Sequence, residues 1–400
     1  MRTHQYTPSG PEVTDWAVFT LLDALGWAAT RRRLGPRDLL RLLVRAAVAL
    51  RSLSAVAREA RAVPSWEAVR GALRRYLPGQ PADLLPATTQ ALQRHLPRGL
   101  RRRPRAVAID WHLRPYYGSP RTAGVTRGKE KASTKYFFAY ASALVVVRGQ
   151  PCTVGLTHVG PGEAQAAVLD RLLGQLRRAG LRVRRLLLDR AFYGAATIDW
   201  LQRQRLPFIM PMLKRGQEGR SKATSTGTAQ FFVRRRRGWA TYTWTTPQRR
   251  GRRQSEKLTV TVQVCMVPRP KGCRRKKGPL VYACHGIRLS LDGVRRCYRR
   301  RFGIETSYRQ LGEGLAVTCS KDPTYRLLLV AIALVLRNLW VWLHWEYLAE
   351  RTAHGRVVDL PRLPLRHLLY VLQRVLDDRL DIRPELLTPR GSRTTDSQKG

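Results

Sequence analysis

The first hundred residues carry apolar side chains at helical spacing. In "WAVFTLLDALGWAA" and "DLLRLLVRAAVALRSL" they recur every three or four positions, which predicts helices over residues 14–96. Within this range, "SLSAVAREARAVPSWEAVRGALRRYL" predicts a short helix, a turn at 62–64, and a second helix capped by Ser65. This is the outline of a helix-turn-helix, with Arg70 and Arg74 on the helix that would enter a major groove. An ordinary helical hairpin in a bundle fits the same pattern.

A basic linker, "RGLRRRPR" (98–105), separates these helices from a region of mixed pattern. Five short apolar stretches predict strands and two amphipathic stretches predict helices, in the order β-β-β-α-β-α-β. The stretches are "AVAID", "YFFAYASALVVVRG", "PCTVGLTHV", "GEAQAAVLDRLLGQLRRAG" (a helix), "VRRLLLDRAFYG", "AATIDWLQRQ" (a helix) and "LPFIMPM". This order predicts a mixed α/β (α+β) fold, with helices packed against a mixed sheet.

Residues 214–279 interrupt that rhythm with alternating stretches such as "WATYTWTT" and "KLTVTVQVCMV", which predict a β-rich insertion. After it we expect a strand at "VYACHG", a helix over 292–312 and a long apolar helix over 324–350. The run "LLLVAIALVL" in the last helix is too short to span a bilayer and predicts a buried helix. We therefore divide the chain into a helical N-terminal domain (1–100), a mixed domain (101–350), and a C-terminal helical segment with a disordered tail (351–400).

The charge of the chain points to its partner. Seventy-four Lys and Arg residues stand against 27 Asp and Glu, a net charge of +47. Such a field favours polyanions, and nucleic acid is the main candidate; a membrane surface or another acidic partner is the rival. The six cysteines contain no C-x-x-C pair and no signal peptide opens the chain, so we expect reduced thiols and a cytoplasmic, nucleoid-associated protein without a membrane span.

In so basic a chain, the positions of the few acidic residues are informative. Asp110 ends the apolar stretch "AVAID", and Asp189 ends "RRLLLD". Sites in open α/β sheets form at the carboxyl ends of strands, so the two carboxylates are expected to lie close together. Their repulsion raises one pKa unless a cation lies between them. A pair of Mg²⁺ or Mn²⁺ ions would supply that charge.

The stretch "CYRRRFGIETSYRQL" places a third carboxylate among basic residues. On one continuous helix, Tyr298, Arg301, Glu305 and Arg309 fall within an arc of about 80°. Glu305 would then complete a three-carboxylate metal site, while the tyrosine and the arginines contact the phosphates beside the reacting one. This is the arrangement that two-metal phosphoryl transfer requires.

Each acid alone has a simpler interpretation. Glu305 with Arg301 or Arg309 makes ordinary i,i+4 helix pairs. Asp110 and Asp189 are also typical of strand-end turns, the latter with Arg190 as its partner. The two strand-end aspartates and the Tyr/Arg/Glu/Arg helix occur together in a chain of charge +47, and this combination favours a catalytic site.

The stretches "AIDWHLRPYYG", "LLLDRAFYG" and "YRRRFGIETSYRQ" resemble, in order, the three catalytic blocks of DDE insertion-sequence transposases. They are most similar to the cut-and-paste group with the signature Y-x2-R-x3-E, here Tyr298, Arg301 and Glu305. One departure is Gly312, where many relatives have Lys. Arg309 would then take the basic role, as in the subgroup with the pattern E-x3-R. The resemblance covers about residues 100–345.

The resemblance implies an RNase H-like catalytic core with a β-rich insertion, and a bacterial or archaeal protein. It implies two Mg²⁺ or Mn²⁺ ions on Asp110, Asp189 and Glu305. The DNA partners would be terminal inverted repeats, bound through the N-terminal region, and a target duplex, with two protein copies in the synapse. The remaining DNA contacts expected are Arg190, Lys214, Arg215, and Trp239 and Trp244, which would stack on a flipped base; for the tryptophans, shielded strand positions are an equal alternative.

The function expected is metal-dependent cleavage of DNA at element ends and strand transfer into target DNA. Two alternatives remain open from the residues: an RNase H-like nuclease without strand joining, and a catalytically inactive, domesticated DNA-binding protein. All three carboxylates are present, which argues against the inactive form.

Overall fold

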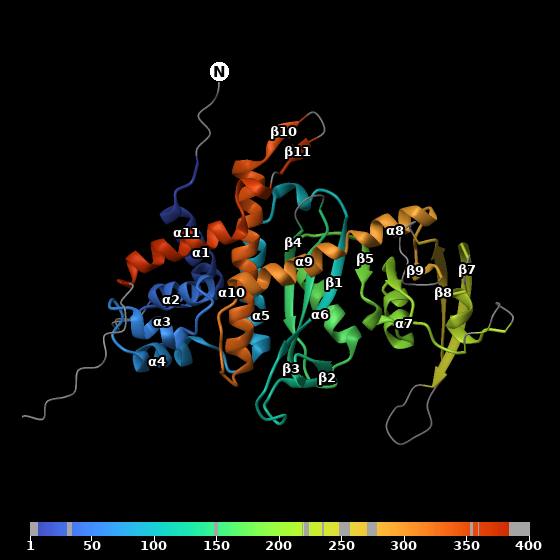
Figure 1. Cartoon of the computed structure of the whole chain (residues 1–400), viewed down its shortest axis with the longest axis horizontal. Coiled ribbons are helices and arrows are strands. Elements are labelled where there is room, and N and C mark those ends of the chain that lie inside the picture. Colours follow the sequence, from blue (N-terminus) through green and yellow to red (C-terminus); the bar gives the residue numbers. More distant parts are fainter. Residues whose placement is uncertain are drawn as a thin grey trace, which may run out of the picture.

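The computed structural model of the chain is elongated, with helices at one end and a long twisted sheet at the other (Figure 1). It describes residues 7–29, 34–147, 151–217, 219, 224–233, 236–247, 257–269, 278–352, 355–358 and 360–383. The predicted C-terminal tail lies outside the described residues.

Five helices precede the sheet, as the apolar spacing predicts. They are α1 (Gly10–Leu25), α2 (Pro36–Val48), α3 (Leu53–Glu59), α4 (Trp66–Tyr76) and α5 (Pro81–Arg94). The predicted short helix, turn and capped helix are confirmed as α3 and α4, and Ser65 Oγ accepts a hydrogen bond from the Ala68 N–H at 3.2 Å. Whether α4 enters a DNA groove stays a prediction.

The strands form one mixed sheet with the order β2-β3-β1-β5-β6-β9-β8-β7, and β4 also pairs with β3. Their bounds are β1 (Arg105–Pro115), β2 (Val125–Lys131), β3 (Thr134–Val145), β4 (Cys152–His158), β5 (Val183–Leu188), β6 (Phe208–Pro211), β7 (Gly238–Pro247), β8 (Lys257–Val267) and β9 (Leu280–His285). The expected mixed α/β class is therefore confirmed. The strands of the insertion, β7 and β8, extend this sheet through the antiparallel pair of β8 and β9.

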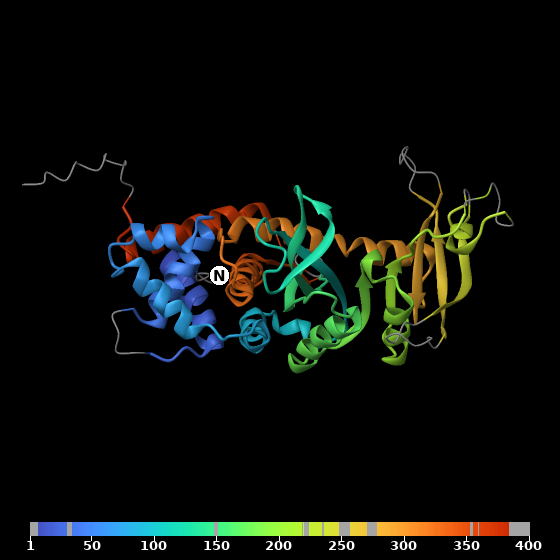
Figure 2. The same ribbon diagram turned by 90° about the horizontal axis from the view of Figure 1, so that it is seen from below.

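Helices cover both faces of the sheet. Figure 2 shows α6 (Gln165–Arg178) and α7 (Ala195–Arg203) on one side, and α8 (Leu291–Arg299) and α9 (Phe302–Leu311) on the other. Consecutive residues of β5 accordingly enter different cores: Leu186 and Leu188 belong to one cluster and Leu187 to the other. A strand buried on both faces reads as a continuous apolar run, which is why "LLL" sits at this position.

The longest helix, α10 (Pro323–Leu343), continues into a π-helical turn at His344–Leu348. It is long and apolar enough to cross a bilayer, but 94% of its most apolar window is buried inside the protein, as predicted. It joins the helical end to the sheet, since it packs on α5, α2 and β4. The remaining elements are β10 (Glu350–Thr352), β11 (Gly355–Val357) and α11 (Leu365–Arg379).

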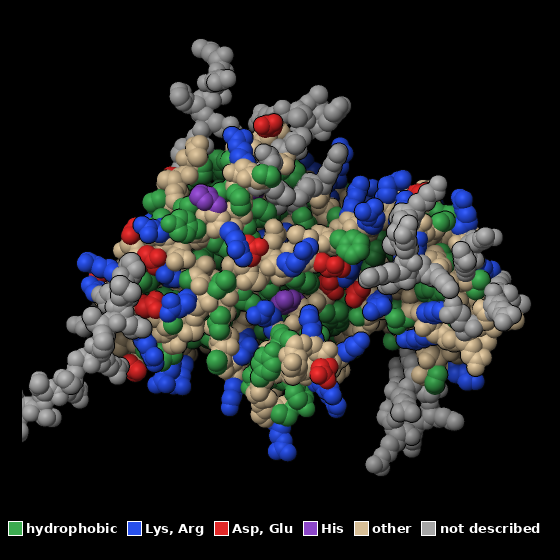
Figure 3. Space-filling model, in the orientation of Figure 1, with side chains coloured by type: hydrophobic (Ala, Val, Ile, Leu, Met, Phe, Trp, Pro, Cys, Tyr) green, Lys and Arg blue, Asp and Glu red, His purple; other side chains and the backbone are tan. Residues whose placement is uncertain are grey.

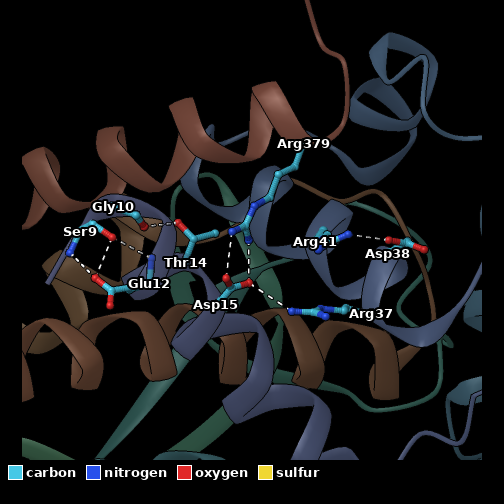
Figure 4. Close-up of polar contacts among 9 residues, drawn as sticks. All are labelled: Ser9, Gly10, Glu12, Thr14, Asp15, Arg37, Asp38, Arg41 and Arg379. Carbon is cyan, nitrogen blue, oxygen red and sulfur yellow. Dashed lines mark hydrogen bonds and ion pairs between the residues drawn. The ribbon is translucent and has the colours of Figure 1, made fainter.

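The C-terminal helix α11 is tied to the N-terminus by charge (Figure 4). Both guanidinium Nη atoms of Arg379 donate to the Asp15 carboxylate, at 2.7 and 2.9 Å, and Arg37 approaches the same carboxylate at 3.3 Å. The hydrogen bond from Arg379 lowers the pKa of Asp15. Beside this pair, Ser9 and Glu12 form a capping box that starts α1. Helices α1 and α11, far apart in sequence, therefore belong to one helical unit.

Asn338 is a buried polar link within α10. Its side-chain amide donates to Leu92 O at 2.9 Å and to Thr153 O at 2.6 Å, and its Oδ1 accepts from the Thr153 N–H at 3.1 Å. We expect Asn338→Leu to lower the free energy of unfolding by about 3 kcal/mol, because it leaves buried backbone groups of α5 and β4 without partners. Urea unfolding measures this loss. Leu339→Val trims the same helix without breaking a hydrogen bond and should cost about 1 kcal/mol; equal losses in the two variants would contradict the assignment.

Candidate active site

Asp110 and Asp189 lie side by side because they follow the same rung of two paired strands. β1 and β5 run parallel, and their last paired residues are Ile109 and Leu188. Each aspartate is the next residue along its chain. The sequence predicted that Asp110 ends its strand, and this was wrong: β1 continues to Pro115 because β3 still pairs with it on the other side. The pairing of β1 with β5 ends at Ile109 and Leu188, so the two strands separate at the aspartates.

The three predicted carboxylates converge on one guanidinium. The Arg301 Nη2 atom lies 2.7 Å from Asp110 Oδ2 and 3.7 Å from Asp189 Oδ1, and its Nη1 atom lies 3.1 Å from Glu305 Oε1. The arginine side chain is 5% exposed, whereas the carboxylates are increasingly open: 12% for Asp110, 36% for Asp189 and 49% for Glu305. On the face shown in Figure 3, acidic side chains gather over this part of the sheet, with basic side chains around them.

The helix that carries Glu305 is broken. A single helix over 292–312 was predicted, but α8 ends at Arg299 and α9 begins at Phe302. At the junction the Arg301 N–H bonds to Tyr298 O and the Ile304 N–H to Arg301 O, three residues back in place of four. The predicted single face of Tyr298, Arg301, Glu305 and Arg309 is therefore wrong, since this tightening turns Arg301 inward while Arg309 stays exposed.

Two tyrosines fasten these helices to the strands that carry the aspartates. Tyr298 is buried, and its hydroxyl donates to Leu188 O at 3.1 Å, directly before Asp189. The Tyr308 hydroxyl donates to Asp110 O at 2.9 Å and lies 2.9 Å from Ser142 Oγ, while its ring stacks on His112 with centroids 4.7 Å apart. Tyr308 escaped the sequence reasoning; its position three residues after Glu305, on the same side of a helix, was the available signal.

Burial raises the pKa of Asp110 to about 6; Arg301 opposes this rise and Asp189 adds to it. Because the ordinary value is 3.8, the folded protein holds this proton more tightly than the unfolded chain. Its stabilising contribution is complete below pH ~4 and lost as the pH rises through ~6.

In metal-free protein, we therefore expect the free energy of unfolding to fall by up to about 3 kcal/mol between pH 4 and 7 through this one group. Urea unfolding over that range measures the slope, and Asp110→Asn should flatten it. Asp170→Asn, an exposed acid on α6, is the control. Equal pH slopes in wild type and Asp110→Asn would show that the carboxylate titrates normally.

The donor set fits a hard divalent cation. All three side chains are carboxylates, the ligand type that Mg²⁺ and Mn²⁺ prefer, and a positive group already lies between them. Across the described residues, no group of three or more His, Cys, Asp or Glu side chains already lies close enough to hold a metal ion. The carboxylates are kept apart because the guanidinium of Arg301 lies between them and pairs with each through its Nη atoms. The Nε atom of Arg301 is buried without a partner.

The other predicted DNA contacts are exposed basic side chains on several elements. Arg190 is exposed on the 3₁₀ turn that follows Asp189. Lys214 and Arg215 are exposed after β6, and the Arg215 guanidinium lies 5.9 Å from the Tyr193 ring centroid. Arg70 and Arg74 are exposed on α4. The basic positions are thus spread over both ends of the molecule.

Trp239 and Trp244 point to opposite sides of β7, where exposed and half-buried residues alternate. Trp239 is 41% exposed. Trp244 packs between Tyr193 and Tyr242, with ring centroids 5.7 and 5.3 Å apart. The structure therefore does not bring the two tryptophans together on one surface.

The chain is thus a strongly cationic α/β protein, with a mixed sheet and three carboxylates gathered around one guanidinium. Residues 101–337 match the family described as Transposase DDE domain, and because this is more than half of the chain, the protein belongs to that family. The matched range contains all three carboxylates. The family's domain is RNase H-like, and it implies a DNA-processing enzyme of transposition that uses divalent metal ions. A search of curated proteins found no match.

Proposed function

We propose that the protein is a cut-and-paste transposase of the Y-x2-R-x3-E group, which cleaves DNA at element ends and joins those ends to target DNA. The observation that carries the proposal is the convergence of Asp110, Asp189 and Glu305 on the single guanidinium of Arg301. The three acids come from β1, from the turn after β5 and from α9, and their convergence on one positive group supports a site for a cation there.

Asp110, Asp189 and Glu305 would hold two Mg²⁺ or Mn²⁺ ions, which when bound activate water or a 3′-hydroxyl and stabilise the leaving oxygen. The chain itself contributes position: Tyr298 and Tyr308 fix the carboxylate-bearing backbones through Leu188 O and Asp110 O. With the acids held by the ions, Arg301 would be available to contact a phosphate beside the reacting one through both of its Nη atoms.

Exposed basic residues would hold the DNA on either side of this centre. We assign terminal-repeat binding to the N-terminal helices, with Arg70 and Arg74 of α4 in the groove. Arg190, Arg309, Lys214 and Arg215 contact the backbone near the cut. Trp239 is the exposed aromatic of the insertion available for stacking, whereas Trp244 would first have to leave Tyr193 and Tyr242. The working form is a homodimer with two element ends, in the bacterial or archaeal nucleoid.

The test is an assay with a short duplex that carries the terminal repeat found beside the gene, a supercoiled target plasmid and Mg²⁺. Joined product supports the proposal. Cut product without joining would identify a nuclease of the same fold, and a shifted complex without cutting would identify an inactive DNA-binding protein. Removing Mg²⁺ with EDTA should stop both reactions and leave DNA binding.

A further inference from the structure

A second cavity lies at the far end of strand β1, away from the three carboxylates. It has a volume of about 430 Å³ and is bounded by the β1–β2 turn, the loop between α9 and α10, and the start of α10. We call it the β1–β2 pocket. Its basic residues are Arg114, Lys321 and Arg326, its aromatic residues are Tyr116, Tyr117 and Tyr140, and no Asp or Glu is among the described residues that line it.

The strand itself connects this pocket to the active site. Asp110, His112 and Arg114 alternate with their neighbours on β1 and therefore lie on one face of the sheet. From Asp110 to Arg114 is roughly 13 Å along a strand, or about four base steps of a B-form DNA strand. A DNA strand with its reacting phosphodiester at the carboxylates is long enough to reach the pocket.

Two of the basic groups differ in how they are held. The Arg326 guanidinium is fixed: Nε donates to Ser320 O at 2.6 Å, Nη2 donates to Thr318 O at 3.3 Å, and it lies over the rings of Phe138 and Tyr116. The Arg114 side chain, half-buried, forms no hydrogen bond or ion pair with any residue that the structure describes, although its backbone pairs with Phe138 in the sheet. A half-buried guanidinium close to a second one and without a carboxylate calls for an anion.

The aromatic rim is built for a flat ligand. Tyr117 is 72% exposed, yet its hydroxyl donates to Ala132 O at 2.9 Å, which fixes the ring at the mouth of the pocket. Behind it, a Cβ on Gly118 would lie 2.3 Å from the Tyr116 hydroxyl, so any larger residue here would displace the Tyr116 ring. The sequence "PYYG" thus specifies a rigid turn that presents one tyrosine to solvent.

We propose that the β1–β2 pocket binds an unstacked nucleotide of the DNA strand, with its base on Tyr117 and its phosphate on Arg114 and Lys321. This inference rests on the proposed function and adds a site outside the carboxylates and the insertion. A cation next to an exposed, rigid aromatic ring is the general chemistry of single-strand binding, in which stacking and phosphate contacts act together.

The test uses the full-length protein in EDTA, so that no cleavage occurs, and two fluorescent 15-mers: oligothymidylate and an abasic strand with the same phosphates. Wild type should bind oligothymidylate at least about tenfold more tightly. Tyr117→Ala should abolish that preference without changing affinity for the abasic strand, and Tyr117→Phe should keep it. The control is Tyr370→Ala, an aromatic on α11 that is 56% exposed, which should behave as wild type.

Arg114→Gln should weaken both strands and lower the slope of log K against log salt by about one. Arg178→Gln removes the same charge from the exposed end of α6 and should leave the slope unchanged. If Tyr117→Ala still prefers oligothymidylate over the abasic strand, the proposed nucleotide site is wrong. The proposed function would stand as long as wild type joins DNA ends. Failure of wild type to bind either strand would also overturn the pocket, while the joining assay alone decides the proposed function; equally tight binding of free dTMP would make this a nucleotide site unrelated to DNA.

Discussion

Glu305→Gln should lower DNA cleavage and joining by about a thousandfold, while DNA affinity stays within a factor of two of wild type. The change keeps the shape of the side chain and removes one of the three negative charges that face Arg301. A ligand of a catalytic ion is worth several kcal/mol in the transition state, and about 4 kcal/mol corresponds to that rate loss. Because the Glu305 side chain is half exposed, the fold should tolerate the change. Single-turnover cleavage in Mg²⁺, with a gel shift in EDTA, measures both quantities.

The matched control is Glu313→Gln, eight residues along the chain. Glu313 pairs with Arg366 at 3.7 Å and takes no part in the cluster, so its loss should leave the rate unchanged. Cleavage by Glu305→Gln at the wild-type rate would refute the site assignment. A large loss in both variants would mean that net charge, rather than the position of the carboxylate, controls the reaction.

The sequence predicted the helices and strands that have strong apolar patterns and missed strand β2, whose pattern is weak. Strand β2, "VTRGKEK", has six of its seven residues at least partly exposed. An edge strand of this kind has no buried face, so its sequence carries no alternation of apolar and polar residues to detect. The β-rich insertion was recognised from its alternation, but not its union with the main sheet, because alternation within a strand does not say which strand it pairs with; β8 pairs with the next strand of the chain, β9.

The sequence predicted which acidic residues form the site better than it predicted how they are arranged. Strand ends and a lone glutamate identified Asp110, Asp189 and Glu305, because few acids occur in so basic a chain. The role of Arg301 was not predictable. A helical projection assumes a regular 3.6-residue period and assigned Arg301 to a phosphate, whereas one tightened turn there directs its side chain between the acids. Such a turn depends on packing: a Cβ on Gly303 would lie 3.0 Å from Pro151 Cγ, a contact between distant parts of the chain.

Arg301→Ala should lower the free energy of unfolding of the metal-free protein by about 3 kcal/mol at pH 7, because it leaves the poorly exposed Asp110 carboxylate without its partner. The same variant should gain more stability from Mg²⁺ than wild type does. In wild type the ion must displace the guanidinium that lies between the acids, whereas in the variant it only neutralises them. Thermal unfolding across a Mg²⁺ titration, with EDTA as the zero point, measures both effects without requiring activity.

Arg309→Ala is the matched control, since Arg309 lies on the same helix but is exposed. Its stability should stay within about 0.5 kcal/mol of wild type, with the wild-type response to Mg²⁺. If Mg²⁺ stabilises wild type and Arg301→Ala by the same amount, the ion and the guanidinium do not compete, and the ion binds elsewhere. If the variant loses stability and Mg²⁺ restores it, Arg301 is an internal counter-ion that assembles the three carboxylates before the metal arrives. The enzyme would then keep its acids together without metal, and the affinity for Mg²⁺ would include the cost of moving one arginine.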